Sequence, residues 1–196
     1  MKKILLGLLA ILLSAFAIKR IAFTPVYRLM LSADAIVAAK VISHDTVAIE
    51  IEITKVLSTS AKNKVVAGQR IKINHTNNFR YNIKSARIAD NTAAVFYINA
   101  ISYAENFNFT DRFSGIIPLD ADQKVPFSIG SDKKESVTLT QYATAINQIK
   151  TTYTIDKTGM IISKWTKKYI YRKNKMSAFA KFIFDDLERE RSNYAN

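Results

Sequence analysis

Two histidines are the only imidazoles in the chain, and they limit its acid–base and metal chemistry. His44 is followed directly by Asp45, and His75 lies further along the chain. A hydrolase triad or a zinc site would have to use one or both histidines together with a carboxylate. No helical HExxH motif is present, and a His–Asp pair is common in turns for conformational reasons alone. A hydrolase using His44, Asp45 and His75 is therefore an alternative hypothesis and not the leading one.

Other signatures of catalysis are missing from the sequence. Glu50 and Glu52 fall on one face of an expected strand, where a solvated pair is the ordinary interpretation because a catalytic pair needs a cleft and a raised pKa. The five glycines of the chain form no GxGxxG, GxxxxGK[ST] or GxSxG pattern. The absence of cysteine excludes disulfides, thiolate metal sites and cysteine nucleophiles. We therefore expect a protein that is not an enzyme and that uses no cofactor and no metal.

A basic and aromatic stretch near the C-terminus is the most distinctive feature of the sequence. Residues 157–181 contain eight Lys or Arg and no Asp or Glu. Cations interleaved with aromatic rings suit binding to phosphates or to acidic lipids. The predicted ligand-binding residues of this stretch are Lys164, Trp165, Lys167, Lys168, Tyr169, Tyr171, Arg172 and Lys173.

Two structural interpretations of this stretch stay open. It can be an ordinary peripheral helix whose aromatic side chains pack on the sheet, or residues 165–172 can form a strand. A helix would place one set of apolar residues on a shared face. These residues are Ile162, Trp165, Tyr169, Met176, Phe179 and Ile183.

A polar, turn-rich segment over residues 74–82 supplies a second candidate binding loop through Phe79, Arg80 and Tyr81. The formal net charge of the whole chain is +13, which favours contact with anionic surfaces. The partners that we expect are an anionic polymer, a lipid head group or an acidic protein surface, and we expect the protein to be a monomer. Charge alone does not choose among these partners.

The N-terminus resembles a cleavable secretory signal peptide. Lys2 and Lys3 precede an apolar run over residues 4–17, and Ala15 and Ala17 provide the small-x-small pattern of a cleavage site after residue 17. The alternative is an uncleaved anchor over residues 4–18, but its helix would span only roughly 22 Å of a ~30 Å hydrocarbon core. We expect an exported protein, periplasmic or secreted, with membrane anchoring as the alternative.

The middle of the chain predicts a mainly β domain. β-branched and alternating runs indicate strands over residues 35–43, 46–57, 70–74, 93–101 and 114–119, the first two forming a hairpin with one solvent face. A short helix is expected over residues 26–32. Residues 138–150 carry an apolar stripe and the capping-box pair Thr138 and Gln141, which predicts the best helix of the chain.

Three segments in this order resemble the netrin-like domain, whose family includes the tissue inhibitors of metalloproteinases. They are residues 32–41 (SADAIVAAKV), 54–57 (TKVL) and 68–73 (GQRIKI), and the resemblance covers residues 27–101. It implies a five-stranded OB-type barrel with terminal helices packed on it, a fold that binds proteins, glycans or nucleic acids. Inhibitory members of the family present an N-terminal cysteine to the protease metal. This chain has no cysteine, so that chemistry does not carry over and no functional residue is transferred.

These observations give one expected organisation. Residues 1–17 are the signal peptide, residues 18–155 a β-rich OB-like domain with a packed helix, and residues 156–196 a basic amphipathic extension. The expected fold is mainly β with terminal helices (α+β): an OB-like five-stranded barrel or a small antiparallel sandwich, one packed helix and a basic C-terminal helix. The expected function is that of an exported, non-enzymatic binding or interaction module of the cell envelope or extracellular space, with a membrane-tethered envelope protein as an alternative.

Overall fold

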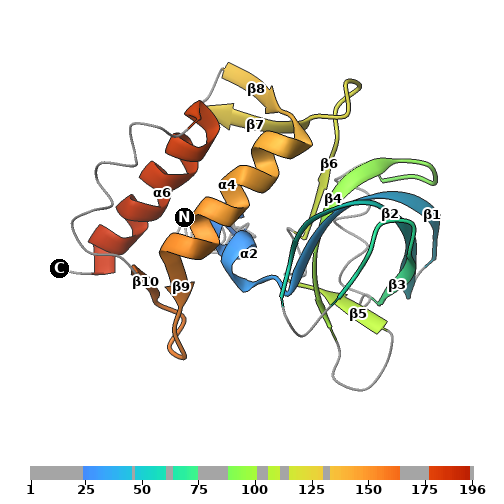
Figure 1. The fold of residues 1–196 in the computed structure, drawn as a ribbon, viewed down its shortest axis with the longest axis horizontal. Coiled ribbons are helices and arrows are strands. Elements are labelled where there is room, and N and C mark those ends of the chain that lie inside the picture. Colours follow the sequence, from blue (N-terminus) through green and yellow to red (C-terminus); the bar gives the residue numbers. More distant parts are fainter. Residues whose placement is uncertain are drawn as a thin grey trace, which may run out of the picture.

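A computed structural model describes residues 24–45, 47–60, 64–74, 88–100, 106–110, 115–129, 133–163 and 177–194. These residues form a β-barrel and, beside it, a layer of helices and short hairpins (Figure 1). Within them, no helix combines the length and the apolar composition needed to cross a bilayer.

Five strands close into a barrel in the order β1-β2-β3-β5-β4-β1. They are β1 (Ala35–His44), β2 (Ala48–Thr59), β3 (Arg70–Asn74), β4 (Ala93–Ala100) and β5 (Asn106–Phe109). Neighbouring strands are antiparallel except β3 and β5, which run parallel. A short strand, β6 (Ile116–Pro118), continues the sheet beyond β4. The predicted OB-like barrel is confirmed, in preference to the sandwich.

β1 and β4 are buried on both faces, and this explains their continuous apolar sequences. Along β1, Val37 points into the barrel core while Ile36 faces the helices. Along β4, Phe96 points into the barrel core while Tyr97 faces the helices. β2 has one solvent face, as its alternation predicts, with Glu50 on the outside. The hairpin of β1 and β2 therefore has its predicted wet face on β2 but not on β1, because helices cover the outer side of β1.

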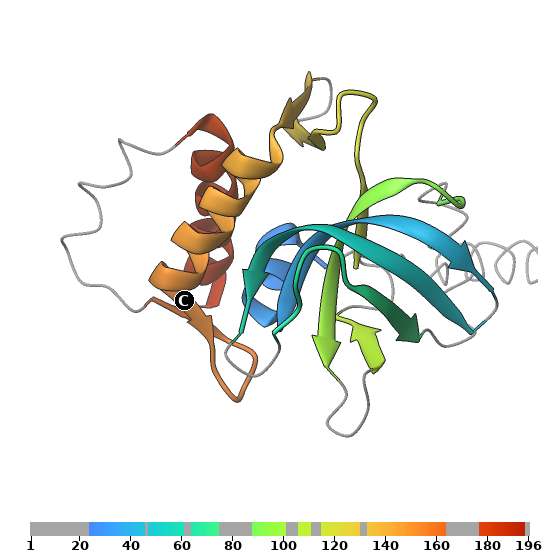
Figure 2. The ribbon, with the colours of Figure 1, turned by 45° about the vertical axis from the view of Figure 1, so that its right-hand side comes forward.

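Among the described residues, three helices and two hairpins form the second layer, which lies beside the barrel (Figures 1 and 2). They are α2 (Val26–Ser32), α4 (Leu139–Thr152), α6 (Ala178–Tyr194), the pair β7 (Val125–Ile129) and β8 (Lys133–Val137), and the pair β9 (Tyr153–Ile155) and β10 (Ile161–Ser163). All three helices contact one another, and α4 also contacts β2. Their apolar faces meet the outer faces of β1 and β4 in a second core, separate from the barrel core.

α4 begins where its capping box predicts. Thr138 Oγ1 accepts a hydrogen bond of 3.2 Å from the Gln141 amide, and Gln141 Oε1 accepts one of 3.0 Å from the Thr138 amide. Two of the otherwise unpaired donors at the helix start are satisfied in this way. Tyr142, Ile146 and Ile149 form the buried stripe that the sequence predicts.

The C-terminal helix is confirmed, and it begins only at Ala178. Ile162 lies in β10, so the helical interpretation was wrong for this residue. The reason is the turn before β10, where Asp156 Oδ1 accepts hydrogen bonds from the amides of Thr158 (2.8 Å) and Met160 (2.9 Å). Gly159 has φ +83°, a conformation that glycine adopts without strain. The chain therefore folds back as a hairpin instead of continuing as a helix.

Acidic residues near the C-terminal end of α6 are paired across the helical layer, which offsets their unfavourable position in the helix dipole. Glu190 accepts hydrogen bonds from the Tyr27 hydroxyl and the Arg28 guanidinium of α2. Burial alone would raise the pKa of Glu190, but the hydrogen bonds from Arg28 and Tyr27 outweigh it and lower this pKa. Arg28 also donates to the Gly159 carbonyl at 3.2 Å. These contacts tie α2, α6 and the β9–β10 hairpin together.

Asp34 joins the helical layer to the barrel at the start of β1. Its amide donates to Asn99 Oδ1 at 2.8 Å, and its carboxylate accepts from the Ala100 amide at 3.2 Å. Lys150, at the end of α4, donates to the Ala33 carbonyl at 2.8 Å. Burial lowers the pKa of Lys150, and Asp34 partly counters this effect. Residues 32–41, which carry the family resemblance, therefore contain the junction between the two layers.

Candidate functional site

The predicted binding residues lie outside the part of the chain that the structure describes. The first group, Lys164, Trp165, Lys167, Lys168, Tyr169, Tyr171, Arg172 and Lys173, falls within residues 164–176. Phe79, Arg80 and Tyr81 fall within residues 75–87. Whether either group is brought together stays a prediction. We name residues 164–176 the basic segment.

The structure does describe both attachment points of the basic segment. On one side it follows Ser163, the last residue of β10. The first residue of that strand, Ile161, is 8% exposed and belongs to the second core. On the other side Ser177 precedes α6 and caps its start: its Oγ accepts a hydrogen bond of 3.2 Å from the Ala180 amide, and Phe179, in the first turn, is buried. The basic segment is thus a connection between two packed elements and not a free tail.

Positive charge is distributed very unevenly along the chain. The described residues contain fourteen Lys and Arg and thirteen Asp and Glu, so they are almost neutral. The remaining residues contain fifteen Lys and Arg and only three Asp and Glu. Six of these fifteen cations lie in the basic segment, which has no acidic residue. The barrel and the helices therefore contribute little to the basic character of the protein.

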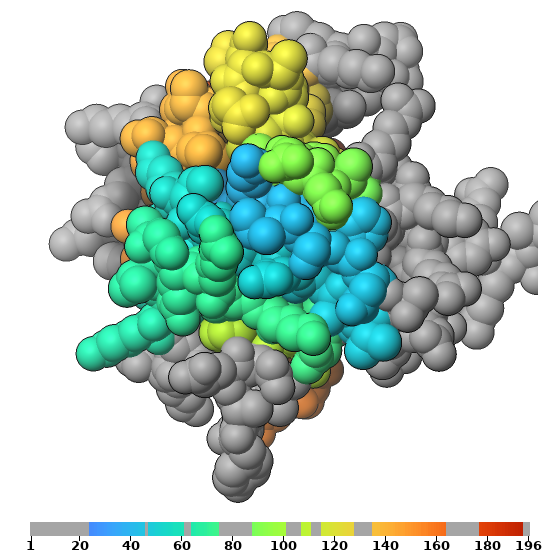
Figure 3. Space-filling view, turned by 90° about the vertical axis from the view of Figure 1, so that its right-hand side faces the viewer, coloured from blue at the N-terminus to red at the C-terminus, as the bar shows by residue number. Residues whose placement is uncertain are grey.

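OB-type barrels commonly bind ligands on the face of the second and third strands. This side of the barrel is shown in Figure 3, where β1, β2 and β3 form the surface. Arg70 Nε lies 3.1 Å from Glu52 Oε2, and Lys72 is opposite Glu50 in the strand register. Among the described outward-facing positions of β2, β3 and β5, none is aromatic. The described part of this face carries charges of both signs and none of the rings on which nucleic-acid bases stack.

Of the three residues in the histidine hypothesis, the structure describes His44 and Asp45, which lie at the turn between β1 and β2. Asp45 Oδ1 accepts from the amides of Val47 (2.6 Å) and Ala48 (2.7 Å), so it shapes the β1–β2 turn. His44 Nδ1 lies 2.9 Å from Asp90 Oδ1, and both side chains are solvent-accessible. His75 lies outside the described residues. Within the described ranges no three side chains are grouped as metal ligands.

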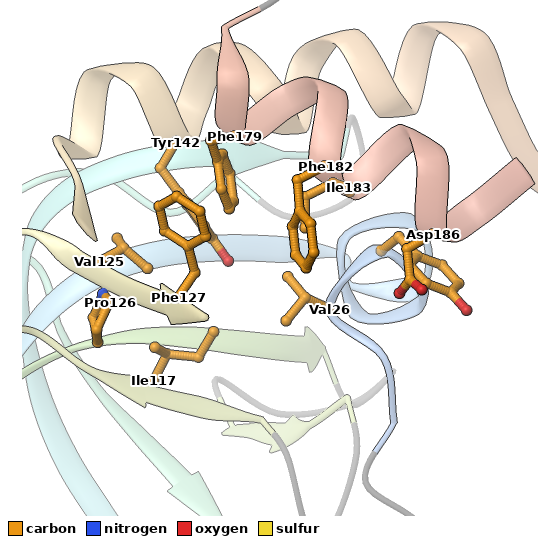
Figure 4. A pocket seen from close by; sticks show the side chains of 11 residues that line it. Val26, Ile117, Val125, Pro126, Phe127, Tyr142, Phe179, Phe182, Ile183 and Asp186 are labelled. Carbon is orange, nitrogen blue, oxygen red and sulfur yellow. The ribbon is translucent and has the colours of Figure 1, made fainter. Parts of the chain in front are cut away.

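A cavity of about 260 Å³ lies in the second core between α2, α6, β6 and β7 (Figure 4). Apolar side chains form most of its wall, among them Phe127, Phe179 and Phe182, and Asp186 is its one charged lining residue. Its volume is below the ~300–1,000 Å³ that is usual for small-molecule sites, and it has few converging polar groups. It offers no arrangement for catalysis.

Two buried tyrosines, Tyr97 and Tyr142, lie in the second core. The hydroxyls of Tyr97 on β4 and Tyr142 on α4 are hydrogen-bonded to each other. Burial raises the pKa of both phenols above the ordinary value of 10.0. Their hydrogen bond joins α4 to β4 inside the second core.

Comparisons with known proteins do not assign the chain to a family: no protein-family model matches it, and no curated protein is similar to it in sequence. The resemblance to the netrin-like domain stays a prediction. The candidate site therefore rests on the residues themselves.

Sequence reasoning missed one feature next to the basic segment. Met160 and Ile162 are each 45% exposed, although both are large and apolar. The sequence signal for it is the turn over Asp156 to Gly159 followed directly by three apolar residues, which is typical of a strand after a turn. The helical stripe that includes Ile162 competes with this signal.

Proposed function

We propose that this protein is an exported, non-enzymatic binding module that binds an anionic ligand through the basic segment. The observation that supports this most directly is the charge distribution. An almost neutral body of barrel and helices holds, between β10 and α6, thirteen residues with six cations and no anion. The barrel and the helical layer then serve as a scaffold.

Electrostatics explains why this arrangement favours a ligand. Cations that are close in sequence and have no acidic neighbours repel one another, and a bound polyanion relieves that repulsion while releasing counterions. Attachment at both ends also restricts the segment before binding, so it loses less conformational entropy than a free tail would. Trp165, Tyr169 and Tyr171 add rings that can stack on bases or enter a lipid interface.

The test is a variant of the exported protein, residues 18–196, in which five of the six cations of the basic segment are replaced by Gln, so that the net charge falls by five. The replaced residues are Lys164, Lys167, Lys168, Arg172 and Lys173. The matched control makes the same change in net charge elsewhere, at Lys40, Lys55, Lys64, Lys72 and Lys124. Binding to a labelled 20-nucleotide single strand and to vesicles containing phosphatidylglycerol is measured at 50 and 200 mM salt.

We expect wild-type affinity for the single strand to fall about 100-fold between the two salt concentrations, as for roughly five phosphate contacts. The segment variant should lose most of its binding and of its salt dependence, whereas the control variant should keep both. Equal losses in the two variants would show that net charge matters and the segment does not. Absence of wild-type binding to both ligands would refute the proposal.

Export is tested separately by sequencing the N-terminus of the protein recovered from cells. The proposal expects the mature chain to begin at Ile18, because cleavage follows Ala17. A protein that keeps its N-terminal residues and fractionates with membranes would favour the membrane-tethered alternative.

A further inference from the structure

We infer that the anionic ligand is a phospholipid bilayer and that Met160 and Ile162 enter its interface; this inference rests on the proposed function. The two side chains lie two positions apart in the β9–β10 hairpin, so they project from the same face. Between them, Ile161 points the other way, into the second core. We call Met160 and Ile162 the hairpin patch.

The exposure of the hairpin patch is unusual for this molecule. Only four large apolar side chains are exposed among the described residues. Val47 and Val66 lie in separate turns, and single residues of this kind are normal on protein surfaces. Met160 and Ile162 are two positions apart in one hairpin, and each is 45% exposed.

The hairpin holds this patch in a fixed orientation. Asp156 Oδ1 accepts from the Thr158 hydroxyl at 2.7 Å as well as from two amides of the turn. These hydrogen bonds, of which the one from the Thr158 hydroxyl contributes most, lower the pKa of Asp156 and outweigh its desolvation. Arg28 attaches the turn to α2 through the Gly159 carbonyl. Figure 2 shows the hairpin projecting beyond the nearby ends of α4 and α6.

Charge identifies the occupant of this surface. β10, which carries Ile162 and directly follows Met160, leads into the basic segment, and Lys157 is exposed in the turn. Two carboxylates of α6 are already engaged, Glu190 with Arg28 and Glu188 with Arg191. Apolar side chains on a strand that continues in sequence into cations and aromatic residues match a bilayer interface with anionic head groups. A soluble polyanion would match the cations but would leave Met160 and Ile162 in water.

The test compares two double variants that carry similar changes at different places. One replaces the hairpin patch, Met160→Thr and Ile162→Thr, which a β-strand tolerates. The control replaces Val47→Thr and Val66→Thr, the other two exposed apolar residues. Both proteins are titrated with vesicles of 70% phosphatidylcholine and 30% phosphatidylglycerol, with vesicles of phosphatidylcholine alone, and with a 20-nucleotide single strand. Circular dichroism spectra and thermal midpoints check that each variant is folded.

We expect the hairpin variant to bind the anionic vesicles about tenfold more weakly than wild type and to bind the single strand equally well. The control variant should bind both ligands as wild type does. Trp165, the only tryptophan of the chain, should shift its fluorescence to shorter wavelength with anionic vesicles and not with phosphatidylcholine alone.

Two results separate the inference from the proposed function. If wild type binds the single strand and the vesicles but the hairpin variant binds vesicles unchanged, the bilayer inference is overturned and a soluble polyanion becomes the ligand. If wild type binds neither, the proposed function fails as well.

Discussion

Replacing Phe184 with Ala should lower the free energy of unfolding by about 3–5 kcal/mol, the cost of deleting a fully buried aromatic side chain. Phe184 is 1% exposed, and its ring centroid lies 5.5 Å from that of Tyr153. It therefore joins α6 to the strand that follows α4. Urea unfolding followed by far-ultraviolet circular dichroism measures the change.

The control for this prediction is Arg189→Ala, because the Arg189 side chain is 74% exposed on the same helix. Its replacement should change the free energy of unfolding by no more than about 0.5 kcal/mol. If Phe184→Ala were as mild as the control, α6 would not belong to the cooperative core.

The packing of α6 makes truncation an unsuitable test of the basic segment. A chain ending at Lys150 would lose the basic segment together with α6, whose buried residues complete the second core. They are Phe179, Ala180, Ile183, Phe184 and Leu187. Truncation would therefore mix loss of binding with loss of folding, and charge substitution avoids this.

Tyr97→Phe and Tyr142→Phe should each lower the free energy of unfolding by about 1–3 kcal/mol, while the double variant should cost less than the sum. Each single change leaves the other buried hydroxyl without the partner that the structure gives it. The double change removes both hydroxyls, so no polar group is left unsatisfied. Urea unfolding of all four proteins forms a double-mutant cycle, and additive costs would contradict a direct bond between the hydroxyls.

The same pair predicts a loss of stability at high pH. Burial raises the pKa of Tyr97 and of Tyr142 above 10.0 in the folded state. As pH rises above about 10, the unfolded chain ionises these phenols while the folded protein keeps their protons, so the unfolded state is favoured. Stability should therefore be fully present below pH 10 and fall above it. The double Phe variant should show a smaller fall, and an identical fall would contradict this origin.

Sequence by itself determined the elements whose patterns depend on local chemistry. The alternation of β2 predicted its wet face, and the capping box predicted the start of α4 at Thr138. The absence of cysteine and of glycine motifs restricted the chemistry of the whole chain. These features need only neighbouring residues and a backbone period, so no tertiary contact is required to recognise them.

Tertiary structure decided everything that depends on which faces meet. Periodicity did not show that Ile36 and Tyr97 face a second core, because a strand that is buried on both faces has no polar alternation. It also did not show that β3 and β5 pair in parallel to close the barrel. Ile162 fitted a helical stripe, but the turn at Asp156 directs it outward on a strand. The fold also fixes both attachments of the basic segment, since they depend on the long-range packing of Ile161 and Phe179, which no local pattern encodes.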